Sequence, residues 1–230
     1  MSEFNDNSPS LLEVRDLSWT PDGAERPLWE GVSFRVESGE SLIVSGQSGS
    51  GKSTLLRCVV YLEKPSAGEV WWRGRRVESE DIRRFRHHVV YVHQTPVAIA
   101  TTVEEEMGFA REMSRALADE TSAALDEEGQ KGLLDRFGLG DLDWGRRVDE
   151  LSVGERQRVA LVRCLSVGPE VLLLDEPTAS LDDTNARRVE DYVTEYVNER
   201  DGRAAVWITH SREQRERLGG RIVDIDDFTG

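Results

Sequence analysis

The sequence predicts an α/β fold with a mostly parallel core sheet, an antiparallel β element near its start and an inserted α-helical subdomain. Apolar runs typical of buried strands, such as Ser41–Ser45 and Val171–Leu174, alternate with segments of helical periodicity. The first run leads into Gly46–Thr54, which matches the P-loop pattern G-x-x-x-x-G-K-[S/T]. The apolar spacing after Gly51 predicts a helix, so the loop lies in the strand–loop–helix context that gives this pattern its meaning.

The chemistry of a P-loop explains the residue types within it. Glycines let the backbone turn without steric cost and bring its N–H groups close to an anion. Lys52 can reach the β- and γ-phosphates of a nucleotide, and the Ser53 hydroxyl can ligate Mg²⁺. A helix that begins here adds its positive end. The nucleotide-binding residues expected in this loop are Gly46, Gln47, Ser48, Gly49, Ser50, Gly51, Lys52, Ser53 and Thr54.

Composition and charge limit the classes of protein to which this chain can belong. The chain has 230 residues, which suits one domain with a sizeable core, and a net charge of −15, which argues against a nucleic-acid partner. No apolar run is long enough to span a membrane. Residues 1–10 are polar, show no signal-peptide features and are expected to be disordered. Cys58 and Cys164 lie among apolar residues, as is typical of buried thiols in a reducing compartment.

The first part of the chain has mostly strand patterns. In Gly31–Val36 the apolar residues alternate, which places Val32, Phe34 and Val36 on one face of a strand. The basic residues from Arg83 to His88 are expected on a solvated face or in a patch near a partner. Further strands are expected at Leu11–Leu17, Glu69–Arg73 and Val89–Val92.

The middle of the chain, about residues 95–167, is predicted to be a helical subdomain between core segments of about 11–94 and 168–226. Thr102 and Glu105 form a capping-box pattern that opens one helix. A second helix is expected over residues 119–137, and a third from Ser152 to Leu165. The whole chain is therefore expected to form one domain.

The last part returns to strands and carries two carboxylates. A buried strand is predicted at Val171–Leu174, a further core strand at Ala204–Ile208 and the last strand at Arg221–Ile225. Asp175 and Glu176 directly follow the first of them. A carboxylate at the end of a core strand beside a P-loop can hold Mg²⁺ directly or through water, and a second can deprotonate an attacking water.

Five further motifs follow the P-loop, and their order resembles that of the ATP-binding-cassette (ABC) family. The likeness extends from about Leu11 to Asp226. Gln94 is similar to the Q-loop glutamine, Leu151–Glu155 to the LSGGQ signature, Val171–Glu176 to Walker B with the catalytic glutamate, Ser180–Asp182 to the D-loop, and His210 to the switch histidine.

The resemblance implies a role for each motif. Gln94 would be a Mg²⁺ ligand that links the reaction to the helical subdomain, and His210 would contact the γ-phosphate. Ser152, Gly154 and Glu155 would serve the ATP bound by the other subunit, so that two chains enclose two ATP molecules.

Two further ATP contacts are implied. Asp182 would lie at the dimer seam. Trp19 is the best candidate for the aromatic ring that stacks on adenine in this family, and the alternative is a core or edge tryptophan.

The chain departs from the family pattern at three positions. Val153 stands where the signature usually has glycine, which adds bulk near the phosphate. Glu155 replaces glutamine, and Gln47 stands where proline is common. We expect function to persist, with altered affinity or rate.

The implied protein is an ATP-hydrolysing subunit with a RecA-like P-loop NTPase fold, which drives an integral membrane permease from the cytoplasmic face of the membrane. Val90–Pro96 and Ala205–His210 look most like compact bacterial ATPases assigned to iron export.

The alternative is a non-transport ABC protein that acts in DNA repair or on the ribosome. The segment from Gln94 to Leu151 is too short for the coiled coil of a repair protein. A ribosomal protein of this family would carry two cassettes. A regulatory cassette is disfavoured because Lys52 and the motif carboxylates are present.

Overall fold

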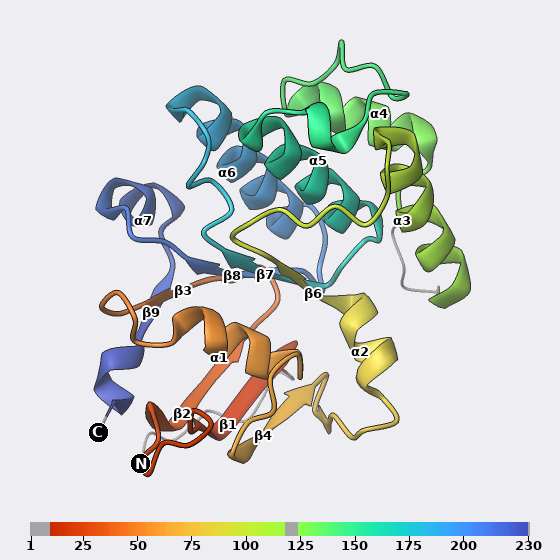
Figure 1. The fold of residues 1–230 in the computed structure, drawn as a ribbon. Coiled ribbons are helices and arrows are strands. Elements are labelled where there is room, and N and C mark those ends of the chain that lie inside the picture. Colours follow the sequence, from red (N-terminus) through yellow and green to blue (C-terminus); the bar gives the residue numbers. More distant parts are fainter. Residues whose placement is uncertain (1–9, 118–123, 230) are drawn as a thin grey trace.

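The computed structural model describes residues 10–117 and 124–229, in which two sheets are separated by a helix (Figure 1). The sequence predicts disorder for residues 1–10. Of these, residues 1–9 lie outside the described residues. All neighbouring strands of the five-stranded core sheet pair in parallel. Its strand order is β6 (Val89–Val92), β7 (Val171–Asp175), β8 (Ala204–Ile208), β3 (Ser41–Ser45) and β9 (Arg221–Asp224). The predicted parallel core is confirmed.

The second sheet is antiparallel and lies at the start of the chain. Its order is β2 (Trp29–Val36), β1 (Leu12–Trp19), β4 (Ala67–Trp72) and β5 (Arg75–Arg76). Val32, Phe34 and Val36 are all buried, as their alternation predicts. The predicted antiparallel element is therefore present and presents one apolar face to the core.

The core sheet is covered on both faces by different sets of elements. The helix α1 (Lys52–Val59) lies between the two sheets, below the core sheet in Figure 1. Successive residues of β7 alternate between two apolar clusters: Val171 and Leu173 pack with α1 and the antiparallel sheet, whereas Leu172 and Leu174 pack beneath the opposite helices. The helices next to the sheet on that side are α5 (Val153–Ser166) and α6 (Asp183–Asn198), and α3 (Val103–Leu117) and α4 (Glu127–Arg136) pack on α5.

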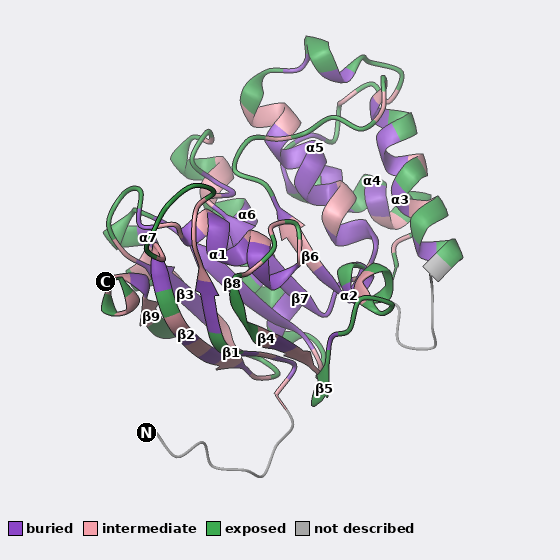
Figure 2. Ribbon diagram, turned by 60° about the horizontal axis from the view of Figure 1, so that its bottom comes forward, coloured by how far each residue is buried: buried purple, intermediate pink, exposed green. Residues whose placement is uncertain are grey.

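This double burial explains why the central strands β3, β7 and β8 consist mostly of apolar residues, and Figure 2 shows the buried colour along them. Thr102 and Glu105 form the predicted capping box: the Glu105 N–H donates to Thr102 Oγ1 at 3.3 Å, and the Thr102 N–H donates to Glu105 Oε2 at 3.1 Å. Among the residues described, no helix combines the length and apolarity needed to cross a bilayer.

Two expectations need correction. The second helix of the helical subdomain does not extend back to residue 119 in the part that is described, because Leu125 and Asp126 precede it and α4 begins at Glu127. The Asp126 carboxylate accepts a hydrogen bond from the Gly129 N–H at 2.8 Å, which caps the helix there.

The segment from Arg83 to His88 is not only a solvated basic face. It belongs to α2 (Ile82–His88), in which the arginines are exposed but Phe85, His87 and His88 are buried. A further short helix, α7 (Arg212–Leu218), follows β8 and has no counterpart in the sequence prediction.

Candidate functional site

The P-loop joins the carboxyl end of β3 to α1, and two of its glycines are required by close packing. Gly46 and Gly51 both have positive φ, at 145° and 89°. A Cβ atom at Gly46 would lie 2.5 Å from Ile225 Cγ2, and one at Gly51 would lie 2.6 Å from Leu28 Cδ2. The loop is therefore seated against β2 and the C-terminal segment, and a side chain at either position would displace it.

Lys52 is held inside this loop. Its side chain is buried, and its Nζ donates hydrogen bonds to the carbonyl oxygens of Gly46 at 2.9 Å and Gln47 at 2.6 Å. Burial lowers the pKa of Lys52, and the nearby carboxylates of Asp226 and Glu176 oppose that change.

The beginning of α1 is free of a side-chain cap. Gly51 is the N-cap residue and makes no side-chain hydrogen bond to the first turn. The first N–H groups of a helix have no partner within it, so this end offers donors and a positive dipole. The buried Ser50 hydroxyl also has no hydrogen-bond partner among the described residues. A cradle of glycine, lysine and uncapped N–H groups fits a phosphate chain.

Ser53 lies in contact with the end of β7. Its Oγ donates to Asp175 Oδ1 at 2.9 Å, and the Tyr91 hydroxyl donates to Asp175 Oδ2 at 2.6 Å. The pKa of Tyr91 is raised, mainly because the hydroxyl is buried and to a smaller extent because it is hydrogen-bonded to Asp175. Hydroxyl and carboxylate oxygens are the ligands that Mg²⁺ prefers, so Ser53 and Asp175 fit that ion.

Glu176 and His210 approach each other beyond the ends of β7 and β8. His210 Nε2 lies 3.0 Å from Glu176 Oε1. Glu176 has a φ of 47°, an uncommon conformation for a residue with a side chain, and its N–H donates to Ile208 O at 3.1 Å. The backbone of the neighbouring strand therefore fixes the direction in which the Glu176 carboxylate points.

The signature and D-loop residues lie together elsewhere in the chain. Ser152 caps α5 and forms a capping box with Glu155. A Cβ atom at Gly154 would lie 3.4 Å from Ser180 O. Asp182 caps α6 by accepting from the Asn185 N–H at 2.9 Å.

Within the described part of the chain, no hydrogen bond or ion pair joins these four residues, Ser152, Gly154, Glu155 and Asp182, to the P-loop. Val153 is half exposed at the first turn of α5, so its side chain points to solvent and does not fill the chain's own core.

Gln94 and Trp19 lie at the margins of the site. Gln94 is exposed just beyond the end of β6. Trp19 is half-buried and its ring stacks on that of Trp29, with centroids 6.5 Å apart. Trp29 in turn borders Gly51, where a Cβ atom would come within 2.7 Å of its Nε1. Trp19 is thus close to the P-loop, with the Trp29 ring next to the loop itself.

Two residues near the site were missed from the sequence. Tyr91 could have been found from the parallel pairing of β6 with β7, which brings it opposite Leu173 and close to Asp175. No sequence motif marks Asp226. Its Oδ2 accepts a hydrogen bond at 2.9 Å from the N–H of Gln47, which is 179 positions away in the sequence. Proline, common at position 47, could not donate this hydrogen bond.

Comparison with known proteins agrees with this geometry. Residues 29–179 match the model of the ABC transporter family. The chain is 34% identical, over 92% of its length and 89% of the relative's, to the probable iron export ATP-binding protein FetA of Escherichia coli (strain K12). It is also 34% identical to the phosphonates import ATP-binding protein PhnC 2 of Synechococcus sp. (strain JA-2-3B'a(2-13)), over 94% and 81% of the two chains.

A solved ATP-binding subunit of an ABC transporter has the same fold, with a TM-score of 0.79 and 26% identity over 94% of this chain and 86% of that one. The two carboxylates at the end of β7, the P-loop and the inserted helices define a P-loop ATPase. The chain belongs to the ABC transporter family and is one of its ATP-hydrolysing subunits.

Proposed function

We propose that two copies of this chain enclose two molecules of ATP with Mg²⁺ and that hydrolysis drives an integral membrane permease from the cytoplasmic face of the membrane. The observation that carries this proposal is the convergence of Lys52, Ser53, Asp175, Glu176 and His210 at one edge of the core sheet. The placement of Ser152 and Asp182 outside this cluster supports their use in the site of a second copy.

The reaction assigns a task to each residue of the cluster. The P-loop N–H groups and Lys52 bind the β- and γ-phosphates, and Ser53 and Asp175 hold the metal ion, with Gln94 as a further ligand. Mg²⁺ supplies neutralisation of phosphate charge when it is bound. Glu176 accepts a proton from the attacking water. The oxygen of this water forms a bond to the γ-phosphorus, and the bond between the γ-phosphorus and the ADP oxygen breaks. His210, 3.0 Å from Glu176, keeps that carboxylate and the γ-phosphate in register.

The chain is proposed to act as one domain, with a core of about residues 11–94 and 168–226 and a helical subdomain of about 95–167. Trp19 is proposed to stack on adenine. Metal export, iron in particular, is the proposed process, and the likeness to the iron export protein FetA supports it. The chain is equally identical to a phosphonate import protein, and we infer that the membrane subunit, and not this chain, decides the substrate.

The test begins with the genes on either side of the one that encodes this chain: a multi-span membrane protein encoded there would be the candidate permease, and it is reconstituted with this chain. Vesicles that contain both subunits should hydrolyse ATP and move Fe²⁺ in an ATP-dependent way, and vesicles with Lys52→Ala should do neither. Phosphonate and sulfate serve as competing cargoes. ATP hydrolysis with movement of another cargo would overturn iron export alone, whereas a folded Lys52→Ala chain with normal ATP affinity would overturn the assigned ATP site.

A further inference from the structure

Gln214 is a buried amide of α7 whose side chain contacts residues beside both members of the Glu176–His210 pair. It is 5% exposed on an otherwise largely exposed helix. Its Oε1 accepts a hydrogen bond from Thr209 Oγ1, and its Nε2 donates to Thr178 Oγ1 at 2.9 Å and Glu190 Oε1 at 3.0 Å. The acceptor and both donors of the amide are thus used, as a buried glutamine requires.

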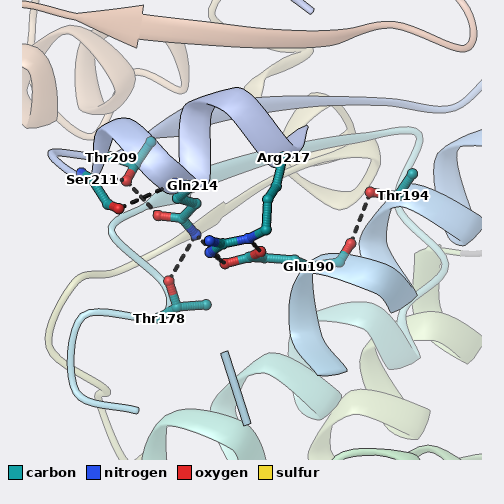
Figure 3. A network of polar contacts seen from close by, with 7 residues as sticks. All are labelled: Thr178, Glu190, Thr194, Thr209, Ser211, Gln214 and Arg217. Atoms are coloured by element: carbon teal, nitrogen blue, oxygen red, sulfur yellow. Dashed lines mark hydrogen bonds and ion pairs between the residues drawn. The ribbon is translucent and has the colours of Figure 1, made fainter. Parts of the chain in front are cut away.

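The contacts of Gln214 lie on three separate segments, as Figure 3 shows. Thr209 directly precedes His210 at the end of β8, and Thr178 lies two residues beyond Glu176. Glu190 belongs to α6 and is itself fixed by Arg217, whose Nε and second guanidinium nitrogen donate to its two oxygens at 2.8 and 3.0 Å. Gln214 therefore ties the loop after β7 and the loop after β8 to one anchored carboxylate.

The direction of each hydrogen bond favours an amide at this position. The Thr209 hydroxyl accepts from the Ser211 N–H at 3.1 Å and so has its own proton free for the Gln214 oxygen. The Glu190 carboxylate can only accept, so the group facing it must donate. A carboxylate at position 214 would meet Glu190 as a like charge in a buried site.

From this arrangement we propose that Gln214 is a positioning residue for ATP hydrolysis, which holds the Glu176 turn and the His210 loop at the separation that the reaction needs. The inference rests on the roles proposed above for Glu176 and His210. A pocket of about 270 Å³ lies directly beside them and is bordered by both residues and by Thr178, Thr209 and Gln214. The two loops thus border open space, and the amide network that lines the same pocket limits their movement.

Gln214→Glu, Gln214→Met and the double variant Gln214→Glu with Glu190→Gln test this proposal by steady-state ATP hydrolysis. Each single variant should lower kcat by about tenfold or more while KM for ATP changes by less than about twofold, because the P-loop and Lys52 are untouched. The double variant keeps the net charge and a donor–acceptor contact between positions 190 and 214, and should regain part of the kcat lost by Gln214→Glu. The recovery should be incomplete, because the amide at position 190 offers Arg217 one acceptor oxygen in place of two. Glu216→Gln, an exposed change on the same helix, is the matched control and should leave kcat unaltered.

Thermal melting and MgADP affinity, measured on every variant, report folding and the nucleotide site. If both single variants keep kcat within about twofold of wild type, Gln214 does not position the pair. The same conclusion follows if KM rises in step with the fall in kcat. Glu176→Gln is assayed in parallel, and full activity of that variant would overturn the proposed function itself, whatever the Gln214 variants do.

Discussion

Ser53 Oγ donates a hydrogen bond to Asp175 Oδ1 at 2.9 Å, although the two residues are 122 positions apart in the sequence. Ser53 lies in the first turn of α1, directly after the P-loop, and Asp175 ends β7. Ser53 follows β3 and Asp175 is the last residue of β7, and the carboxyl ends of these parallel strands meet at one edge of the sheet. The two proposed metal ligands are therefore brought together by the fold of the chain itself.

Glu176→Gln should keep ATP binding and lose hydrolysis by about 10²–10⁴-fold, because the amide cannot accept the proton of the attacking water. Glutamine has the same size and the same backbone, so the turn at φ 47° is retained. Phosphate release and ATP affinity measure the two effects separately. Asp191→Asn removes an exposed carboxylate of α6 and is the control. Turnover near that of wild type would show that another group activates the water.

Trp19→Ala should weaken ATP binding more than binding of inorganic triphosphate, because only ATP carries a ring that can stack. Calorimetric titration with both ligands makes the comparison. The ring also packs on Trp29, so the melting temperature must be followed. An equal loss of affinity for the two ligands would mean that Trp19 only supports the Trp29 ring beside Gly51.

The start of the signature helix should depend on pH through Glu155. Hydrogen bonds with Ser152 lower the pKa of Glu155 below its ordinary value of 4.5. The Ser152 side chain makes the larger contribution and the Ser152 N–H the smaller one. A lowered folded-state pKa stabilises the folded chain above pH 4.5, and this contribution is lost as the pH falls through the folded-state pKa.

Glu155→Gln should therefore flatten the fall in the free energy of unfolding below pH 4.5 and change it by less than about 1 kcal/mol at pH 7, because glutamine can still accept from the Ser152 N–H. Urea titrations over that range measure both quantities. Glu128→Gln, on the exposed side of α4, is the control. Acid curves that fall equally for wild type and Glu155→Gln would contradict the assigned role of this carboxylate.

The alternation of apolar strands and helical segments predicted the core sheet, because strands such as β7 are buried on both faces and are recognisable as continuous apolar runs. The helix α2 was missed because basic residues surround its buried Phe85, and its other buried positions hold His87 and His88. Histidine at a buried position gives no apolar periodicity.

The site could be predicted only where its residues belong to continuous motifs. Lys52 and Glu176 lie within recognisable stretches of sequence. Tyr91, Asp226 and Gln214 act through hydrogen bonds to residues far along the chain, so only the packing of strands and loops reveals them. Their contacts are set by tertiary structure, which local pattern does not encode.

The last prediction concerns assembly of each ATP site from two copies. Lys52→Ala removes the P-loop charge but leaves Ser152 and Gly154 intact. Ser152→Arg removes the cap of α5 and adds a bulky cation, but leaves the P-loop intact. A homodimer of either variant has two damaged sites, whereas a mixed dimer has one site with both parts sound. Mixing the two should therefore restore hydrolysis, most strongly near equal amounts.

A mixture of wild type with Lys52→Ala shows beforehand whether a dimer with one sound site is active, and the membrane subunit is added if the isolated chains do not dimerise. The structure motivates this test because the Ser152 helix and the P-loop share no hydrogen bond within the described part of one chain. Recovery near equal amounts requires that the signature of one copy completes the P-loop site of the other. With an active control, mixtures no better than the separate variants would place the whole site within a single chain.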